Sequence, residues 1–114
     1  MIFIAIAAGG ALGSVLRYLT GLALPPLGSG LPVGTLLVNV SGSFLLGLLY
    51  GALDQPHASP TLRAFAGIGF CGGFTTFSAF SLETVRMIQE GDTMMAGAYT
   101  VASVVLSLLA TFGG

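Results

Sequence analysis

The sequence predicts an all-α membrane protein with four transmembrane helices, the third of which is broken in the middle of the membrane. Three observations predict this class. Of the 114 residues, 54% are hydrophobic and only 6% are charged, which is too few charges to cover a water-soluble surface. The apolar residues fall into four stretches, each near the length of about 20 residues that crosses a bilayer. One stretch contains GGFTT, a poor helix centre. We therefore expect one four-span domain covering residues 1–114.

The four predicted spans are almost free of charged side chains. They cover residues 1–16, 31–53, 64–82 and 93–112. The joints at residues 25–30, 54–60 and 89–92 hold prolines, glycines and charges, so we interpret them as short turns. A cleaved signal peptide is the alternative for the first stretch, but it would begin with basic residues, whereas this chain begins MIFI. Cys71 is the only cysteine, which excludes an intrachain disulfide.

The positive charges give almost no preference for one orientation in the membrane. The chain has no lysine, and its three arginines divide between the two sides. Arg17 and Arg86 face the first and third joints, while Arg63 and the amino terminus face the opposite side. Orientation follows the Lys/Arg bias of short loops, which here is close to nil. The balance permits an antiparallel, dual-topology homodimer, and the alternative is a modest charge bias that still sets one orientation.

Pairs of glycines four residues apart predict close contacts between helices. Small residues let backbones approach in lipid, where no hydrophobic force drives helices together. The pairs are Gly9 with Gly13, Gly47 with Gly51, and Gly69 with Gly73.

Polar side chains recur every four residues in two spans, so each set shares one face of its helix. The sets are Thr35, Asn39 and Ser43 in the second span, and Tyr99, Ser103, Ser107 and Thr111 in the fourth. A hydroxyl in such a position often bonds only to a carbonyl of its own helix. An asparagine amide has two donors and an acceptor, which one helix cannot satisfy in hydrocarbon. We therefore expect Asn39 to point into a pore or across an interface.

A break in the third span would free backbone groups at membrane depth. Such a break persists only where it is buried or faces an ion. Freed carbonyls suit a hard cation such as sodium, and freed amides suit an anion. After the break, Phe77 and Phe80 share a face and flank Ser78. Packing against lipid or a neighbouring helix is the simple interpretation of these rings, but their positively polarised edges could also help to hold a small anion.

Ionisable side chains are predicted to lie near the ends of spans. Arg17, Glu83 and Arg86 fall within about a turn and a half of a predicted end, as the helical rise per residue indicates. No carboxylate is expected at mid-membrane, where proton-coupled pumps carry one. Arg17 either draws anions towards a vestibule or extends to the lipid headgroups.

Three motifs resemble the signatures of the Fluc/CrcB fluoride channels. They are GALGSVLRY at residues 10–18, GTLLVNVSGSF at 34–44 and GGFTTFSAFS at 72–81, and they occur in the same order as in that family. The resemblance covers nearly the whole chain. It implies a dual-topology homodimer in the cell (inner or plasma) membrane, with two antiparallel pores through which fluoride leaves the cytoplasm passively. It implies no nucleic-acid partner.

The resemblance also implies roles for individual residues. Backbone carbonyls of Gly72 and Thr75 would hold a structural sodium ion at the dimer centre. The residues implied for the fluoride pathway are Asn39, Phe77, Phe80, Ser78, Tyr99, Ser103, Ser107, Thr35 and Arg17. The family usually has a hydroxyl residue where this chain has Ala79, so that position of the polar track is expected to be absent or replaced by water.

Three other classes of protein fit the sequence less well. A small multidrug-resistance-type transporter also has four spans and dual topology, but it needs a glutamate in its first span, where this chain has Ser14 as the polar residue. A lytic or scaffolding membrane protein gives no reason for a broken span. An enzyme is not expected, because one histidine in a turn and no buried acid or nucleophile pair make no catalytic site.

Overall fold

The computed structural model describes residues 1–25, 31–53 and 58–114, and it is helical almost throughout. The elements in chain order are α1 (Ile2–Ala23), α2 (Val33–Leu53), α3 (Pro60–Arg63), the π-helical segment η1 (Ala64–Cys71), α4 (Gly72–Phe74), α5 (Phe77–Gln89) and α6 (Thr93–Gly113). In these residues, four helical stretches are long and apolar enough to cross a membrane, the third of them being Pro60–Gln89 as a whole. The prediction of an all-helical protein with four spans is confirmed.

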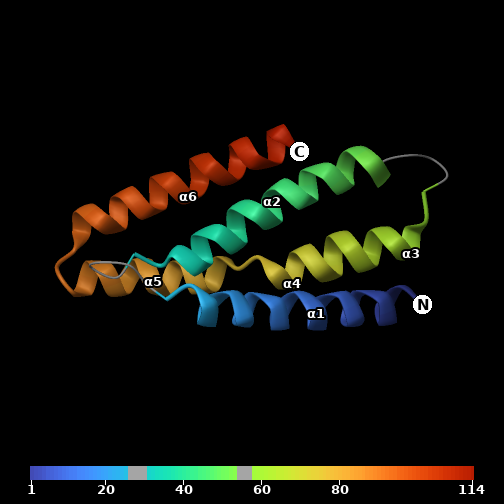
Figure 1. Cartoon of the computed structure of the whole chain (residues 1–114), viewed down its shortest axis with the longest axis horizontal. Coiled ribbons are helices and arrows are strands. Elements are labelled where there is room, and N and C mark those ends of the chain that lie inside the picture. The colour runs from blue at the N-terminus through green and yellow to red at the C-terminus, as the bar shows by residue number, and fades with distance from the viewer. Residues whose placement is uncertain (26–30, 54–57) are drawn as a thin grey trace.

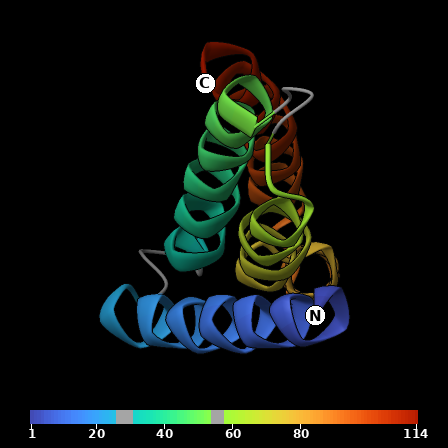
Figure 2. The same ribbon diagram turned by 90° about the vertical axis from the view of Figure 1, so that its right-hand side faces the viewer.

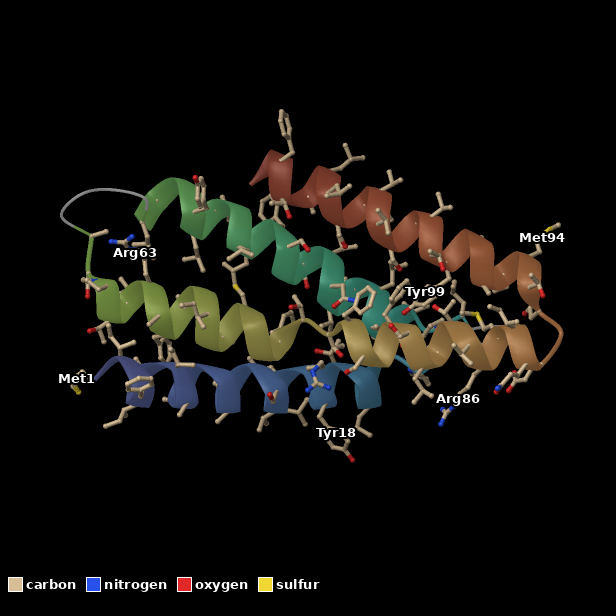
Figure 3. All side chains as sticks on the ribbon, turned by 180° about the vertical axis from the view of Figure 1, so that it is seen from behind. Met1, Tyr18, Arg63, Arg86, Met94 and Tyr99 are labelled. Carbon is tan, nitrogen blue, oxygen red and sulfur yellow. The ribbon has the colours of Figure 1, made fainter. Side chains whose placement is uncertain are left out.

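The helices form an elongated bundle of 51 × 26 × 20 Å. Met1 and Arg63 lie at one end of it, and Arg86 and Met94 lie at the other (Figure 3). The chain therefore runs back and forth along the long axis (Figure 1). Helix α1 packs against η1 and α4, and α2 packs against α6. In the view turned by 90°, α1 lies below the other helices and runs across them (Figure 2).

The predicted ends of the first and third spans are wrong. Helix α1 continues to Ala23 rather than ending at Leu16, and the third span covers Pro60–Gln89 rather than residues 64–82. The predicted ends lie beside the charged residues Arg17, Arg63 and Glu83. The helices continue past Arg17 and Glu83 because both side chains find hydrogen-bond partners within the protein. The second and fourth spans agree with prediction to within two residues.

The joint between α5 and α6 is the short turn that was predicted at residues 89–92. Gly91 has a φ of +84°, a left-handed conformation that glycine adopts at little cost. Its amide donates to the Ile88 carbonyl, and the Asp92 amide donates to the Met87 carbonyl, which ends the helix. The other two predicted turns lie mainly outside the described residues.

Glycines bring the backbones of α1 and the third span into direct contact, as two of the predicted pairs require. A Cβ added to Gly9 would lie 2.8 Å from the Phe70 nitrogen, and one added to Gly69 would lie 2.7 Å from the Ile6 carbonyl oxygen. In the third predicted pair, Gly47 with Gly51, only one glycine makes a close contact between helices. A Cβ on Gly47 would meet the backbone of Thr111, whereas one on Gly51 would meet no described atom within 4 Å.

Substitution of Gly9 by alanine is expected to destabilise the protein by about 1–3 kcal/mol, the usual cost of overpacking a tight contact. The added methyl group would have to push η1 away from α1, because its neighbours there are backbone atoms. Thermal unfolding of the detergent-solubilised protein measures the effect. Gly21→Ala is the control in the same helix, since its methyl group would meet no described atom within 4 Å. Equal melting temperatures for the two variants would show that this contact is not tight.

Candidate functional site

The third span is broken at Thr75 and Thr76. Thr75 has φ −81° and ψ 157°, and Thr76 has φ −151° and ψ 121°, so both are extended between α4 and α5. The predicted break is confirmed, although the glycines of the GGFTT motif remain helical in α4. Thr76 caps α5, because its Oγ1 accepts a hydrogen bond from the Ala79 amide at 3.1 Å.

Four backbone carbonyls at the break, those of residues 72–75, are deprived of their helical donors. In a continuous helix, Gly72 would accept from the amide of Thr76, and Thr75 from that of Ala79. The Thr76 amide instead donates to Asn39 Oδ1 at 2.8 Å, and the Ala79 amide donates to Thr76 Oγ1. Among the described residues, the Gly72 and Thr75 carbonyls gain no substitute donor. These oxygens have the chemistry that a hard cation requires.

Asn39, on α2, makes two hydrogen bonds to the backbone at the break. Its Oδ1 accepts from the Thr76 amide at 2.8 Å, and its Nδ2 donates to the Thr76 carbonyl at 3.1 Å. One side chain therefore satisfies both backbone groups of the extended residue. Asn39 bonds across helices, as predicted, and it also lines a cavity.

That cavity is a groove of about 380 Å³ that runs past the break. Its walls come from α2, η1, α4, α5 and α6, and seven of the predicted site residues contribute to it. The lining residues are Asn39, Gly42, Ser43, Leu46, Gly67, Ile68, Cys71, Gly72, Thr75, Thr76, Phe77, Phe80, Ser103, Val104 and Ser107. None of these residues carries a charged side chain. The site therefore joins hydroxyls, an amide, backbone groups and aromatic rings.

The hydroxyls of α6 differ in how they are satisfied. Ser103 is 7% exposed, and its Oγ has no hydrogen-bond partner in the described part of the chain. Ser107 lies one turn further along the same face and also lines the groove. Thr111 donates to the Ser43 and Ser107 carbonyls. Ser103 thus presents a free hydroxyl, whereas Thr111 is satisfied by backbone.

Three aromatic rings follow one another beside the break. The centroids of Phe77 and Phe80 are 5.5 Å apart, and those of Phe80 and Tyr99 are 5.2 Å apart. Both pairs are tilted, by 48° and 45°, so ring edges as well as faces are presented. Phe77 is 78% exposed although it lines the groove.

Glu83 is a member of the site that the sequence did not lead us to expect. Its Oε2 accepts from Thr35 Oγ1 at 3.1 Å, and its Oε1 accepts from the Tyr99 hydroxyl at 3.3 Å. Thr35 and Tyr99, both predicted for the pathway, thus meet at this half-buried carboxylate instead of lining the groove. Glu83 is one turn beyond Phe80 on α5, and that spacing is the signal that could have identified it.

Ser78 and Arg17 lie outside the groove. Ser78 is exposed, and its Oγ is 3.3 Å from Thr76 Oγ1. Arg17 approaches the break from α1, where its Nε donates to the Gly73 carbonyl at 3.2 Å. At Ala79, the departure from the family pattern, the side chain offers no hydroxyl, and the residue is half-buried.

The chain is similar to known proteins along nearly its whole length. Residues 4–114 match the family model described as CrcB-like protein, Camphor Resistance (CrcB). A relative from Rhizobium meliloti (strain 1021) is 54% identical over 111 residues, covering 96% of this chain and 89% of the relative. Relatives from Caulobacter sp. (strain K31) and Nitrobacter hamburgensis are 51% and 48% identical, covering 96% and 97% of this chain and 88% and 90% of theirs.

The names of these relatives bear on two of the predictions. The first two are named "Fluoride-specific ion channel FluC" and the third "Fluoride-specific ion channel FluC 1". The resemblance drawn from the three motifs is confirmed. The expectation that the chain is not an enzyme is confirmed as well, because the matched family is one of ion channels.

Proposed function

The chain belongs to the CrcB-like protein family, and we propose that it is a fluoride-selective channel that lets fluoride leave the cytoplasm passively. It is a multi-pass membrane protein, and we assign it to the cell (inner or plasma) membrane. The names of its relatives support fluoride as the permeant ion. The observation that carries the proposal is the groove beside the break, where donors and ring edges gather without a charged side chain.

The groove has the chemistry that a small anion needs. The free hydroxyl of Ser103 can donate to it, and Asn39 retains one amide hydrogen beyond the bond to Thr76. The edges of Phe77 and Phe80 add weak positive polarisation without full charge. Binding of this kind is strong enough for an ion to enter and weak enough for it to leave, which conduction requires. Thr35 and Tyr99 remain proposed members of the path beyond the groove, and both donate to the Glu83 carboxylate.

We propose a structural sodium ion at the break. The carbonyls of Gly72 and Thr75 would hold it, because the amides that would occupy them in a continuous helix bond elsewhere. Carbonyl oxygens suit a hard cation. When bound, the ion would supply positive charge to oxygens that have no hydrogen-bond donor among the described residues.

We propose that two copies pair in opposite orientations, with two pores in the dimer. The groove is lined by polar groups yet opens on the outer face of the helices, where Phe77 is 78% exposed. Freed carbonyls and hydroxyls cannot face hydrocarbon without a large cost. A second copy on this face would cover them, and the even distribution of arginines permits insertion either way up.

Ion efflux from liposomes that contain the purified protein tests the proposed function. We expect fluoride to leave without a proton gradient, whereas chloride under the same conditions stays inside. Equal chloride efflux would contradict selectivity. Proton-coupled uptake of cationic compounds would favour the multidrug-transporter alternative, although α1 contains no Asp or Glu to serve it.

A further inference from the structure

Arg17 makes a contact that a role in attracting anions does not explain. Its Nε donates to the Gly73 carbonyl oxygen at 3.2 Å, although the two residues are 56 positions apart in the chain. The bond is partly buried, and it joins α1 to the last turn before the break. Arg17 does not line the groove that we propose as the fluoride path.

The close packing of α1 against α4 determines the position of the Arg17 guanidinium. A Cβ on Gly73 would lie 2.6 Å from the Gly10 carbonyl oxygen, and one on Gly13 would lie 2.7 Å from the Phe74 nitrogen. Backbone thus touches backbone at the level of α4. Arg17 is one helical turn beyond Gly13 on the same face, so its side chain reaches the break in a defined register.

Gly73 needs a donor from outside its own helix. In a continuous helix its carbonyl would accept from the Phe77 amide. Phe77 begins α5 only after the chain has extended through Thr75 and Thr76, so that donor has moved away. An unsatisfied carbonyl is costly in hydrocarbon. Of the carbonyls at the break, that of Gly73 is satisfied by Arg17, while those of Gly72, Phe74 and Thr75 are not satisfied by a described donor.

We propose that Arg17 is a positioning residue for the cation site. By capping the Gly73 carbonyl it holds the last turn of α4, and with it the position of the Gly72 and Thr75 carbonyls that we propose for the ion. This inference rests on the proposed function, because it assumes the cation. The guanidinium is planar and carries its Nε donor at a fixed place along the side chain. Lysine has a methylene there and its nitrogen one bond further out.

Two substitutions separate the Nε donor from the positive charge. Arg17→Lys keeps the charge and removes the Nε donor, whereas citrulline in place of Arg17 keeps the Nε donor and removes the charge. The readouts are hydrogen exchange in the peptide that spans residues 72–79, and the sodium concentration that gives half-maximal protection of it. N-methylglucamine replaces sodium in the reference buffer. The amides of Thr75 and Thr76, bonded to the Cys71 carbonyl and to Asn39, report on the break.

The lysine variant is expected to exchange faster in this peptide and to need about tenfold more sodium, the shift that corresponds to losing one good hydrogen bond. The citrulline variant is expected to match the wild type in both readouts. Arg86→Lys is the control, because Arg86 is exposed at the far end of α5 (Figure 3). Should the lysine variant fail to fold, wild-type behaviour of the citrulline variant would support the inference, and faster exchange in it would overturn the inference.

A lysine variant with the sodium response of the wild type would show that the Nε donor is not needed for the cation site and would overturn the inference. The proposed channel is tested separately. Wild-type protein that conducts fluoride but whose exchange ignores sodium would overturn this inference and leave the channel standing. Wild-type protein that is protected by sodium but does not conduct fluoride would contradict the channel and not the cation site.

Discussion

Replacement of Asn39 by aspartate is expected to lower fluoride efflux by more than about tenfold. A tenfold change corresponds to the free energy of about one good hydrogen bond. Asn39 donates through Nδ2 to the Thr76 carbonyl at 3.1 Å. An aspartate would turn an oxygen towards that carbonyl, which removes the bond and sets two acceptors against each other. It would also add a negative charge to a groove that we propose for an anion. The initial rate of efflux from liposomes, measured with a fluoride electrode, gives the effect.

Ser41→Ala in the same helix is the matched control for Asn39. The Ser41 hydroxyl donates to the carbonyls of Leu37 and Val38 in its own helix, at 2.6 and 3.3 Å, so its loss should leave efflux near the wild-type rate. The size of the detergent-solubilised aspartate variant should also be unchanged, which separates loss of conduction from loss of assembly. Normal efflux through Asn39→Asp would remove Asn39 from the pathway.

Phe80→Ile is expected to reduce fluoride efflux by more than about tenfold as well, because a set of positively polarised ring edges is replaced by an aliphatic side chain. Phe80 stands between Phe77 and Tyr99, with centroid distances of 5.5 and 5.2 Å. Isoleucine keeps the site apolar and fills much of the volume, so the fold should be retained. The same liposome assay measures the change.

Phe112→Ile is the control for loss of an aromatic ring. Phe112 lies near the end of α6 and is 93% exposed, so its ring makes little contact with the rest of the chain. Its replacement should leave efflux unchanged. If Phe80→Ile conducted as well as Phe112→Ile does, the ring edges at the break would have no part in holding the ion.

The four spans and the break could be predicted because both depend on local sequence. Hydropathy over about 20 residues identifies a span, and paired glycines followed by threonines weaken a helix wherever they occur. The ends of the spans depend on distant partners instead. Arg17 and Glu83 look like boundary residues until their acceptor and donors, which come from other helices, are known.

The sequence predicted which residues form the candidate site better than it predicted the hydrogen bonds that they make. Asn39 was expected to bond across helices, because no single helix satisfies an amide in hydrocarbon. That it bridges both backbone groups of Thr76 follows only from the tertiary structure. The π-helical form of residues 64–71 was not expected either, since it accompanies the close packing against α1 rather than any pattern in the segment itself.

The partners of the break both precede it in the chain, which bears on how the protein is made. Arg17 and Asn39 belong to the first two spans, and they satisfy Gly73 and Thr76 of the third. Domains are synthesised from the amino terminus at about 5–20 residues per second, so both side chains leave the ribosome before the broken span does. The side chains that bind the Gly73 and Thr76 backbone groups are therefore already synthesised when the third span enters the bilayer. A chain rearranged to begin with its third span would have to insert that backbone into lipid without them.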